Sequence, residues 1–271
     1  MQAIDELVEI MACLRDRDSG CPWDREQTSA SLVPFTIEEA YEVADAIDRG
    51  ALDDLRDELG DLLFQVVFHA QIAAEGGDFD LAAVARGLAA KLVRRHPHAL
   101  YSLSSLADAA VPDAHAQAAA WEGHKATERA ARAQQGISSR LDGVALALPA
   151  MTRAYKLQKR AAEVGFDWRE TSAVLGAVGE ELAEVREALA RGSEATSAAL
   201  MEEIGDLMFA CVNLARFVGM DPEMVLRRAN SKFEARFRFI ERRLANAGRG
   251  LGDADLAEMD ALWDEAKAEG Y

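Results

Sequence analysis

An all-helical fold is predicted for this chain of 271 residues. Apolar residues recur at i, i+3, i+4, i+7 and i+8, the spacing that places them on one face of a helix. The stripes are Leu59, Leu62, Leu63, Val66 and Val67 in the first half, and Ile204, Leu207, Met208, Cys211 and Val212 in the second. Only six prolines occur, and no segment alternates as a strand would.

The first half is predicted to form helices near residues 2–16, 36–49, 52–75, 80–95 and 114–133. The apolar stripe that begins at Leu59 supports the helix at 52–75. Thr36 followed by Glu39 matches a capping box at the start of the helix at 36–49. Pro97 is expected to stop the helix at 80–95, because the residue before a proline disfavours helical geometry.

The second half is predicted to form helices near residues 150–163, 171–191, 196–218, 221–246 and 254–269. Residues of the first half recur here in the same order, at offsets of 141 to 145. The pairs are Asp24 with Asp167, Glu39 with Glu181, Glu58 with Glu203, Lys91 with Lys232, and Trp121 with Trp263. Residues 133–142 have the composition of a linker. We therefore predict two homologous helical domains, 1–132 and 143–271.

Paired carboxylates stand out in both halves, where E-E-x-x-E is followed by E-x-x-D. Residues three apart share one face of a helix, and each pair borders the apolar stripe. The first half has Glu39, Glu42, Glu58 and Asp61 with Glu38 beside them, and the second has Glu181, Glu184, Glu203 and Asp206 with Glu180 beside them. Packing two such helices gathers four or five carboxylates, a ligand set that suits Mg²⁺ or Mn²⁺.

A single pair of this kind can also be an ordinary solvated face, and the capping box gives Glu39 a structural alternative. In the second half Val178 stands three residues before Glu181 and cannot cap. The duplicated feature is therefore the carboxylates, which favours metal binding.

Two cationic pairs and two tryptophans also recur. Lys232 and Arg236 are four residues apart, as are Lys91 and Arg95. Each pair is either a solvated helix edge or a holder of phosphate oxygens beside a bound cation. Trp121 and Trp263 are either core or interface residues, or platforms on which a nucleobase stacks.

The net charge of −17 argues against binding to nucleic acid or to an anionic membrane, although a divalent cation would still permit a phosphate ligand. No run of about 18 apolar residues is long enough to span a membrane. Three cysteines, Cys13, Cys21 and Cys211, form no disulfide framework, and no leader precedes the first helix, so a cytoplasmic location is expected. None of the five histidines follows a glutamate by three residues, which disfavours a carboxylate-bridged redox bundle.

Longer motifs around these residues resemble the MazG family. These motifs are Gly-Cys-Pro-Trp-Asp at 20–24, Thr-Ile-Glu-Glu-Ala-Tyr-Glu at 36–42, Glu-Leu-Gly-Asp-Leu-Leu-Phe at 58–64, Arg-Arg-His-Pro-His at 94–98, Val-Gly-Phe-Asp-Trp at 164–168, and Lys-Phe-Glu-Ala-Arg-Phe at 232–237. MazG proteins are nucleoside triphosphate pyrophosphohydrolases of the all-α NTP pyrophosphatase superfamily. The resemblance covers essentially the whole chain, in the two-domain form.

The resemblance implies a homodimer that hydrolyses an NTP or dNTP to the monophosphate and pyrophosphate with Mg²⁺. It implies metal ligands at Glu181, Glu184, Glu203 and Asp206, triphosphate contacts at Lys232 and Arg236, and a nucleotide contact at Trp263. Glu180 would orient or deprotonate the attacking water, or act as an outer hydrogen-bonding partner. The C-terminal half would be catalytic, yet the first half keeps the same residue types at Glu39, Glu42, Glu58 and Asp61. The alternative is a non-enzymatic helical protein that binds nucleotides, metals or other proteins.

Overall fold

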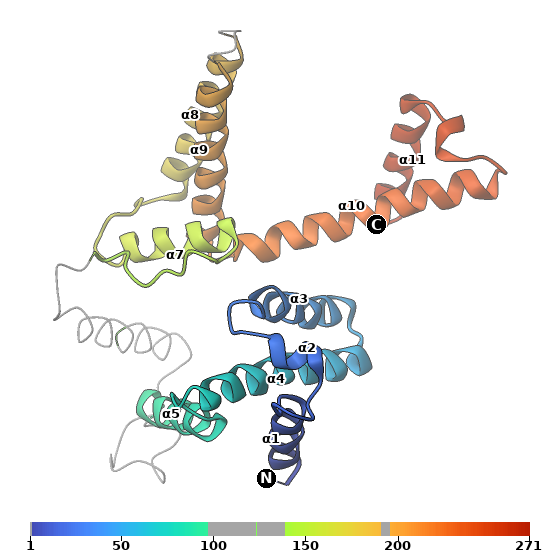
Figure 1. The fold of residues 1–271 in the computed structure, drawn as a ribbon. Helices are drawn as coiled ribbons and strands as arrows, with labels where there is room; N and C mark the ends of the chain where they lie inside the picture. Colours follow the sequence, from blue (N-terminus) through green and yellow to red (C-terminus); the bar gives the residue numbers. More distant parts are fainter. Residues whose placement is uncertain (1, 97–122, 124–138, 191–195) are drawn as a thin grey trace. The chain divides into compact units, whose positions relative to one another are not determined.

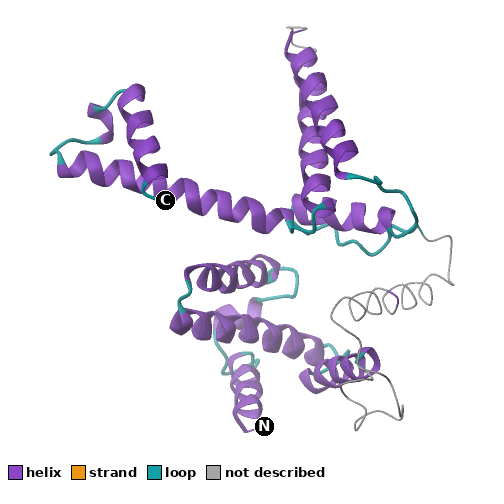
Figure 2. Cartoon of the chain, turned by 180° about the vertical axis from the view of Figure 1, so that it is seen from behind, coloured by secondary structure: helices purple, strands orange, loops and turns teal. Residues whose placement is uncertain are grey.

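The computed structural model describes residues 2–96, 123, 139–190 and 196–271. The regular structure in these ranges consists of α-helices and a 3₁₀ turn, and no strand occurs in them (Figure 2). None of the described helices is both long and apolar enough to cross a membrane. The chain divides into two compact units, Met1–Arg132 and Ala133–Tyr271. The predicted all-α class is confirmed, while the predicted linker at 133–142 stays a prediction.

The described helices of the first unit are α1 (Gln2–Leu14), α2 (Pro22–Glu26), α3 (Val33–Arg49), α4 (Leu52–Glu75) and α5 (Leu81–Arg95). α3 and α4 run antiparallel as a helical hairpin (Figure 1). Gly50 ends α3 with a φ of 69°, a left-handed conformation that glycine adopts without a steric penalty. Because α1 and α5 also pack on α4, α4 is the central helix of this unit.

Buried apolar side chains from α1, α4 and the segment before α3 form the core of the first unit. They are Met11, Leu32, Val67 and Phe68, packed against Val8, Leu63, Phe64, Ile72 and Leu81. Phe68 is completely buried. Such burial, rather than helix propensity alone, stabilises helices of this length.

The segment between α1 and α3 contains the Gly-Cys-Pro-Trp-Asp motif and is held in place by Arg15. This guanidinium donates to both carboxylate oxygens of Glu75 at 2.8 and 2.7 Å, and also to the backbone carbonyls of Asp24 and Gln27. The pairing lowers the pKa of Glu75. A Cβ at Gly20 would lie 2.5 Å from two backbone carbonyl oxygens, so only glycine fits there. Arg15 thus fastens this segment to the end of α4.

The described helices of the second unit are α7 (Ala150–Ala162), α8 (Thr171–Ala190), α9 (Thr196–Phe217), α10 (Pro222–Asn246), a 3₁₀ turn (Leu251–Asp253) and α11 (Leu256–Ala268). α8 and α9 form the second helical hairpin, and α7 packs on α9 (Figure 1). α10 packs on α7 and α9, and α11 packs on α10. The two units therefore share a hairpin, α3–α4 in one and α8–α9 in the other.

The described helices lie close to their predicted ranges, and α5 ends at Arg95, ahead of Pro97, as expected. Two short elements were not predicted, α2 and the 3₁₀ turn Leu251–Asp253, because five and three residues are too few to show a period. The predicted helix at 114–133 lies outside the described residues, apart from Gly123.

The predicted capping box at Thr36 is wrong. α3 begins three residues earlier, at Val33, with Leu32 as its N-cap and Pro34 in its first turn, where proline fits without losing a hydrogen bond. Thr36 lies inside the helix, where its hydroxyl donates to the Leu32 carbonyl at 3.1 Å and lies 3.0 Å from Nε2 of His69. The capping explanation for Glu39 is therefore removed.

Replacing Phe68 by alanine should lower the free energy of unfolding of the first unit by about 3–5 kcal/mol, because a fully buried ring is lost and a cavity remains. The matched control is Val66→Ala, on the same helix but 41% exposed, for which we expect a loss below about 1 kcal/mol. Urea denaturation followed by far-ultraviolet circular dichroism measures both. Equal midpoints for the two variants would contradict this assignment of the core.

Candidate active site

The four acidic side chains predicted as metal ligands in the second unit come from two neighbouring helices. Glu181 and Glu184 lie on α8, whereas Glu203 and Asp206 lie on α9. One carboxylate oxygen from each of Glu181, Glu184 and Glu203 lies within 4.8 Å of the others. Asp206 is near enough for its charge to raise the pKa of Glu181 and of Glu203. The helical hairpin therefore brings all four side chains together.

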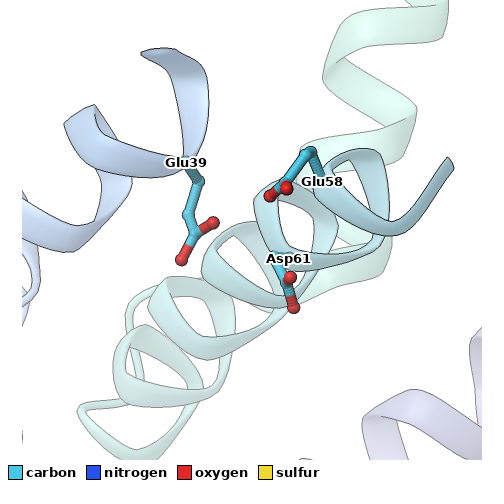
Figure 3. Close-up of side chains that lie close together, drawn as sticks. All are labelled: Glu39, Glu58 and Asp61. Carbon is cyan, nitrogen blue, oxygen red and sulfur yellow. The ribbon is translucent and has the colours of Figure 1, made fainter. Parts of the chain in front are cut away.

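The first unit repeats this arrangement. Glu39 on α3 points toward Glu58 and Asp61 on α4, and one carboxylate oxygen from each lies within 4.8 Å of the others (Figure 3). Glu42 is hydrogen-bonded to Glu39, and its charge also raises the pKa of Glu39. Both hairpins thus carry a cluster of four carboxylates at corresponding positions.

Burial and the crowding of like charges together set the electrostatics of both clusters. Burial raises the pKa of Glu181 and Glu203, and the neighbouring carboxylates raise both further. Glu39 and Glu58 shift in the same direction for the same two reasons. The donors are all oxygens, which are the ligands that Mg²⁺ and Mn²⁺ prefer. The residues therefore fit a hard divalent cation, whose charge would relieve the repulsion.

A cavity of about 550 Å³ lies beside the cluster of the second unit, and Glu181 and Asp206 line it. Apolar side chains from several segments form much of its wall, including Leu157 on α7, Phe166 and Trp168 between α7 and α8, and Phe209 on α9. Its volume lies within the range of about 300–1,000 Å³ that small-molecule sites occupy. The acidic cluster is therefore joined to a largely apolar recess.

An ion pair clamps one wall of this cavity. The terminal nitrogens of Arg216 donate to the two carboxylate oxygens of Asp167 at 3.0 and 2.5 Å, which lowers the pKa of Asp167. Arg216 also donates to Oδ1 of Asn213 at 3.1 and 2.7 Å. The Gly-Phe-Asp-Trp segment is thereby fixed against α9. The sequence analysis missed this role, although the motif itself was the available signal.

Of the other predicted residues of the second unit, only Glu180 lies beside the cluster. Glu180 is exposed on α8, and its charge contributes to the raised pKa of Glu181. Arg236 on α10 lies over the ring of Trp263 on α11, with 5.4 Å from its Cζ to the ring centroid. Lys232 is exposed on α10. In the described part of the chain, the cavity lining does not include Lys232, Arg236 or Trp263. The groups that shift the pKa of Glu181 do not include them either.

Comparison with known proteins addresses both halves of the chain. The model of the MazG nucleotide pyrophosphohydrolase domain matches residues 27–100 and again residues 169–238. The nucleoside triphosphate pyrophosphohydrolase of Escherichia coli K12 is 48% identical over 99% of this chain and 98% of its own length. The protein named nucleoside triphosphate pyrophosphohydrolase/pyrophosphatase MazG from Thermotoga maritima is 41% identical over 97% of this chain and 95% of its own.

The chain belongs to the MazG nucleotide pyrophosphohydrolase family. It is therefore an enzyme that hydrolyses phosphoric anhydrides, as the resemblance in the sequence implied. The two MazG matches contain both carboxylate clusters and both cationic pairs, including Lys91 and Arg95 on α5. Trp263 falls beyond the second match, and Trp121 lies outside both the first match and the described residues.

Mg²⁺ is expected to raise the midpoint of thermal unfolding at about pH 7 and to raise it less at about pH 5. The pKa of Glu181 and of Glu203 lies above the ordinary value in the folded chain. The folded state is therefore penalised at pH values above these pKa values, and the penalty is relieved as the pH falls through them. At the lower pH, protons neutralise the cluster and compete with the cation. Scanning calorimetry with and without Mg²⁺ measures the effect, and equal increments at both pH values would refute it.

Proposed function

We propose that this MazG-family chain hydrolyses nucleoside and deoxynucleoside triphosphates to monophosphate and pyrophosphate with Mg²⁺, and that the second unit carries out the reaction. The observation that carries the proposal is the junction of the α8–α9 carboxylate cluster with a cavity large enough for part of a nucleotide. The printed names of the E. coli and T. maritima relatives support the same activity. A cytoplasmic location stays a prediction.

In this proposal the acidic residues have two tasks, cation binding and activation of water. Glu181, Glu184, Glu203 and Asp206 hold the cation with their carboxylate oxygens. When bound, Mg²⁺ supplies charge neutralisation of the phosphate oxygens and lowers the pKa of water. Glu180, exposed beside this set, orients the attacking water or accepts its proton. The hairpin keeps these groups in place, so positioning and electrostatics supply the acceleration.

Positive charge for the triphosphate comes from α10. This helix carries seven Lys or Arg residues and three Glu residues in a chain whose net charge is −17. We propose that Lys232 and Arg236 bind phosphate oxygens, the arginine through its planar fork. Nε of Arg236 donates to the backbone oxygen of Tyr271 at 2.8 Å, and the ring of Trp263 lies under the same guanidinium. These contacts hold the arginine in a defined position.

We also propose that the chain acts as a homodimer whose interface includes the α8–α9 hairpin. The large apolar side chains of this hairpin that are exposed in the single chain include Leu182 at 39%, Ile204 at 42%, Met208 at 57% and Met201 at 75%. Ile204 and Met208 belong to the apolar stripe that the sequence predicts to be packed. A second copy would cover them, and this association would also explain how the α10 cations reach a cluster that they do not contact within one described chain.

Glu181→Gln and Glu203→Gln should each lower kcat/KM for ATP by more than about 100-fold, since each removes a charged ligand from the cluster, while helicity is retained. The matched controls are Glu39→Gln and Glu58→Gln, the corresponding changes in the first unit, which should keep most of the activity. Product analysis with Mg²⁺ and a panel of NTPs and dNTPs should show monophosphate plus pyrophosphate. Diphosphate plus orthophosphate would refute the reaction, and loss of activity only in the first-unit variants would move it to that unit.

Met208→Lys should convert the dimer to a monomer and reduce hydrolysis by about tenfold or more, because a charge would be buried in an apolar interface. Leu146→Lys is the control, since Leu146 is 82% exposed and lies outside the hairpin. Sedimentation equilibrium gives the mass of each variant. A dimeric Met208→Lys protein, or a monomeric wild type, would contradict this interface.

A further inference from the structure

A buried glutamine of the cavity lacks part of its hydrogen bonding. Gln158 on α7 is 6% exposed and lines the cavity. Its Nε2 donates to the backbone carbonyl of Phe209 at 2.8 Å, whereas its Oε1 has no partner among the described residues. The Phe209 carbonyl fixes which way the amide faces, since a reversed amide would place two acceptors together. Gln158 therefore offers the cavity one acceptor, and leaving such an acceptor unpaired is costly.

The first unit shows why the second unit has this cavity. The offset of 145 that relates Glu58 to Glu203 along α4 and α9 also relates Gln65 to Ala210, and Phe68 to Asn213. Gln65 and Phe68 are 4% and 0% exposed, and Phe68 belongs to the core of the first unit. Ala210 and Asn213 instead line the cavity. At these two positions α9 therefore carries smaller side chains that line the cavity, whereas α4 carries larger buried ones.

The lining suits a flat heteroaromatic ring that carries an N–H group. Trp168 and Phe209 offer aromatic surface, Gln158 offers a buried acceptor, and the metal-binding carboxylates begin at the rim with Glu181 and Asp206. We propose that this cavity holds the nucleobase of the substrate, and that Oε1 of Gln158 accepts a hydrogen bond from an N–H of that base. This inference rests on the proposed function.

The chemistry predicts a specific kind of selectivity. Adenine, cytosine and guanine carry amino groups, and uracil and thymine carry a ring N–H, so each common base can satisfy Gln158. The site therefore tolerates different bases but requires a donor. A site built to hydrogen-bond a polar group discriminates against the analogue that lacks it, because its own buried group is then left unpaired.

The test compares ATP with purine riboside triphosphate, which lacks only the exocyclic amino group. Wild-type kcat/KM should favour ATP by about tenfold or more, and Gln158→Met should abolish this preference. Gln65→Met, which replaces a buried glutamine in the first unit, is the matched control and should preserve it. Calorimetric titration with AMP and with purine riboside monophosphate gives the same comparison without hydrolysis.

A second variant tests whether the open cavity is needed for nucleotide binding. Asn213→Phe copies the residue that α4 carries at this position, so it should fill the cavity and weaken AMP binding by about tenfold or more while the Mg²⁺-dependent thermal shift persists. A Gln158→Met protein that still prefers ATP, or an Asn213→Phe protein that binds AMP as wild type does, would overturn the inference. Absence of pyrophosphate release from every triphosphate by the wild type would instead refute the proposed function.

Discussion

Repulsion among carboxylates at the seam of a helical hairpin is the constraint on which the proposed active unit depends. Apolar packing brings α8 and α9 together, and the i, i+3 spacing then places Glu181, Glu184 and Glu203 within reach of one another. Burial and the neighbouring carboxylates both raise the pKa of Glu203, so each carboxylate makes its neighbours harder to ionise. A hairpin with this arrangement is poorly adapted to stability alone, and its geometry makes sense once a cation shares the seam.

The sequence predicts local features of this fold well, because helical periodicity and carboxylate spacing are local properties. The helix at 52–75 is found as Leu52–Glu75, and both acidic pairs of each half converge as their spacing predicts. Contacts between distant segments were not predicted. The bond from Arg15 to Glu75 spans 60 residues, and the cavity combines five segments whose separations along the sequence follow no helical period. Thr36 failed as a cap because Pro34 started the helix earlier, a competition between two valid local signals.

Duplication explains why the two units look equivalent in sequence yet differ in structure. The carboxylates and cations are the same types in both halves, so the motifs alone give no reason to assign the activity to one unit. The difference lies between the motifs, where Phe68 and Gln65 of α4 correspond to Asn213 and Ala210 of α9. In the first unit Phe68 is part of a packed core. The second unit gives up that packing and keeps a space lined by Glu181.

The net charge of the chain bears on which phosphate compounds can approach the carboxylate clusters. A free triphosphate approaching a protein of net charge −17 is repelled, whereas a triphosphate carrying a divalent cation brings the charge that the carboxylates need. In the proposed complex, the cations on α10 bind the outer phosphate oxygens, and the apolar cavity holds the opposite end of the nucleotide. Binding at both ends would orient the scissile anhydride without a strong attraction for polyanions in general. We therefore expect the acidity of this protein to favour a small phosphate that carries a cation over a long nucleic acid.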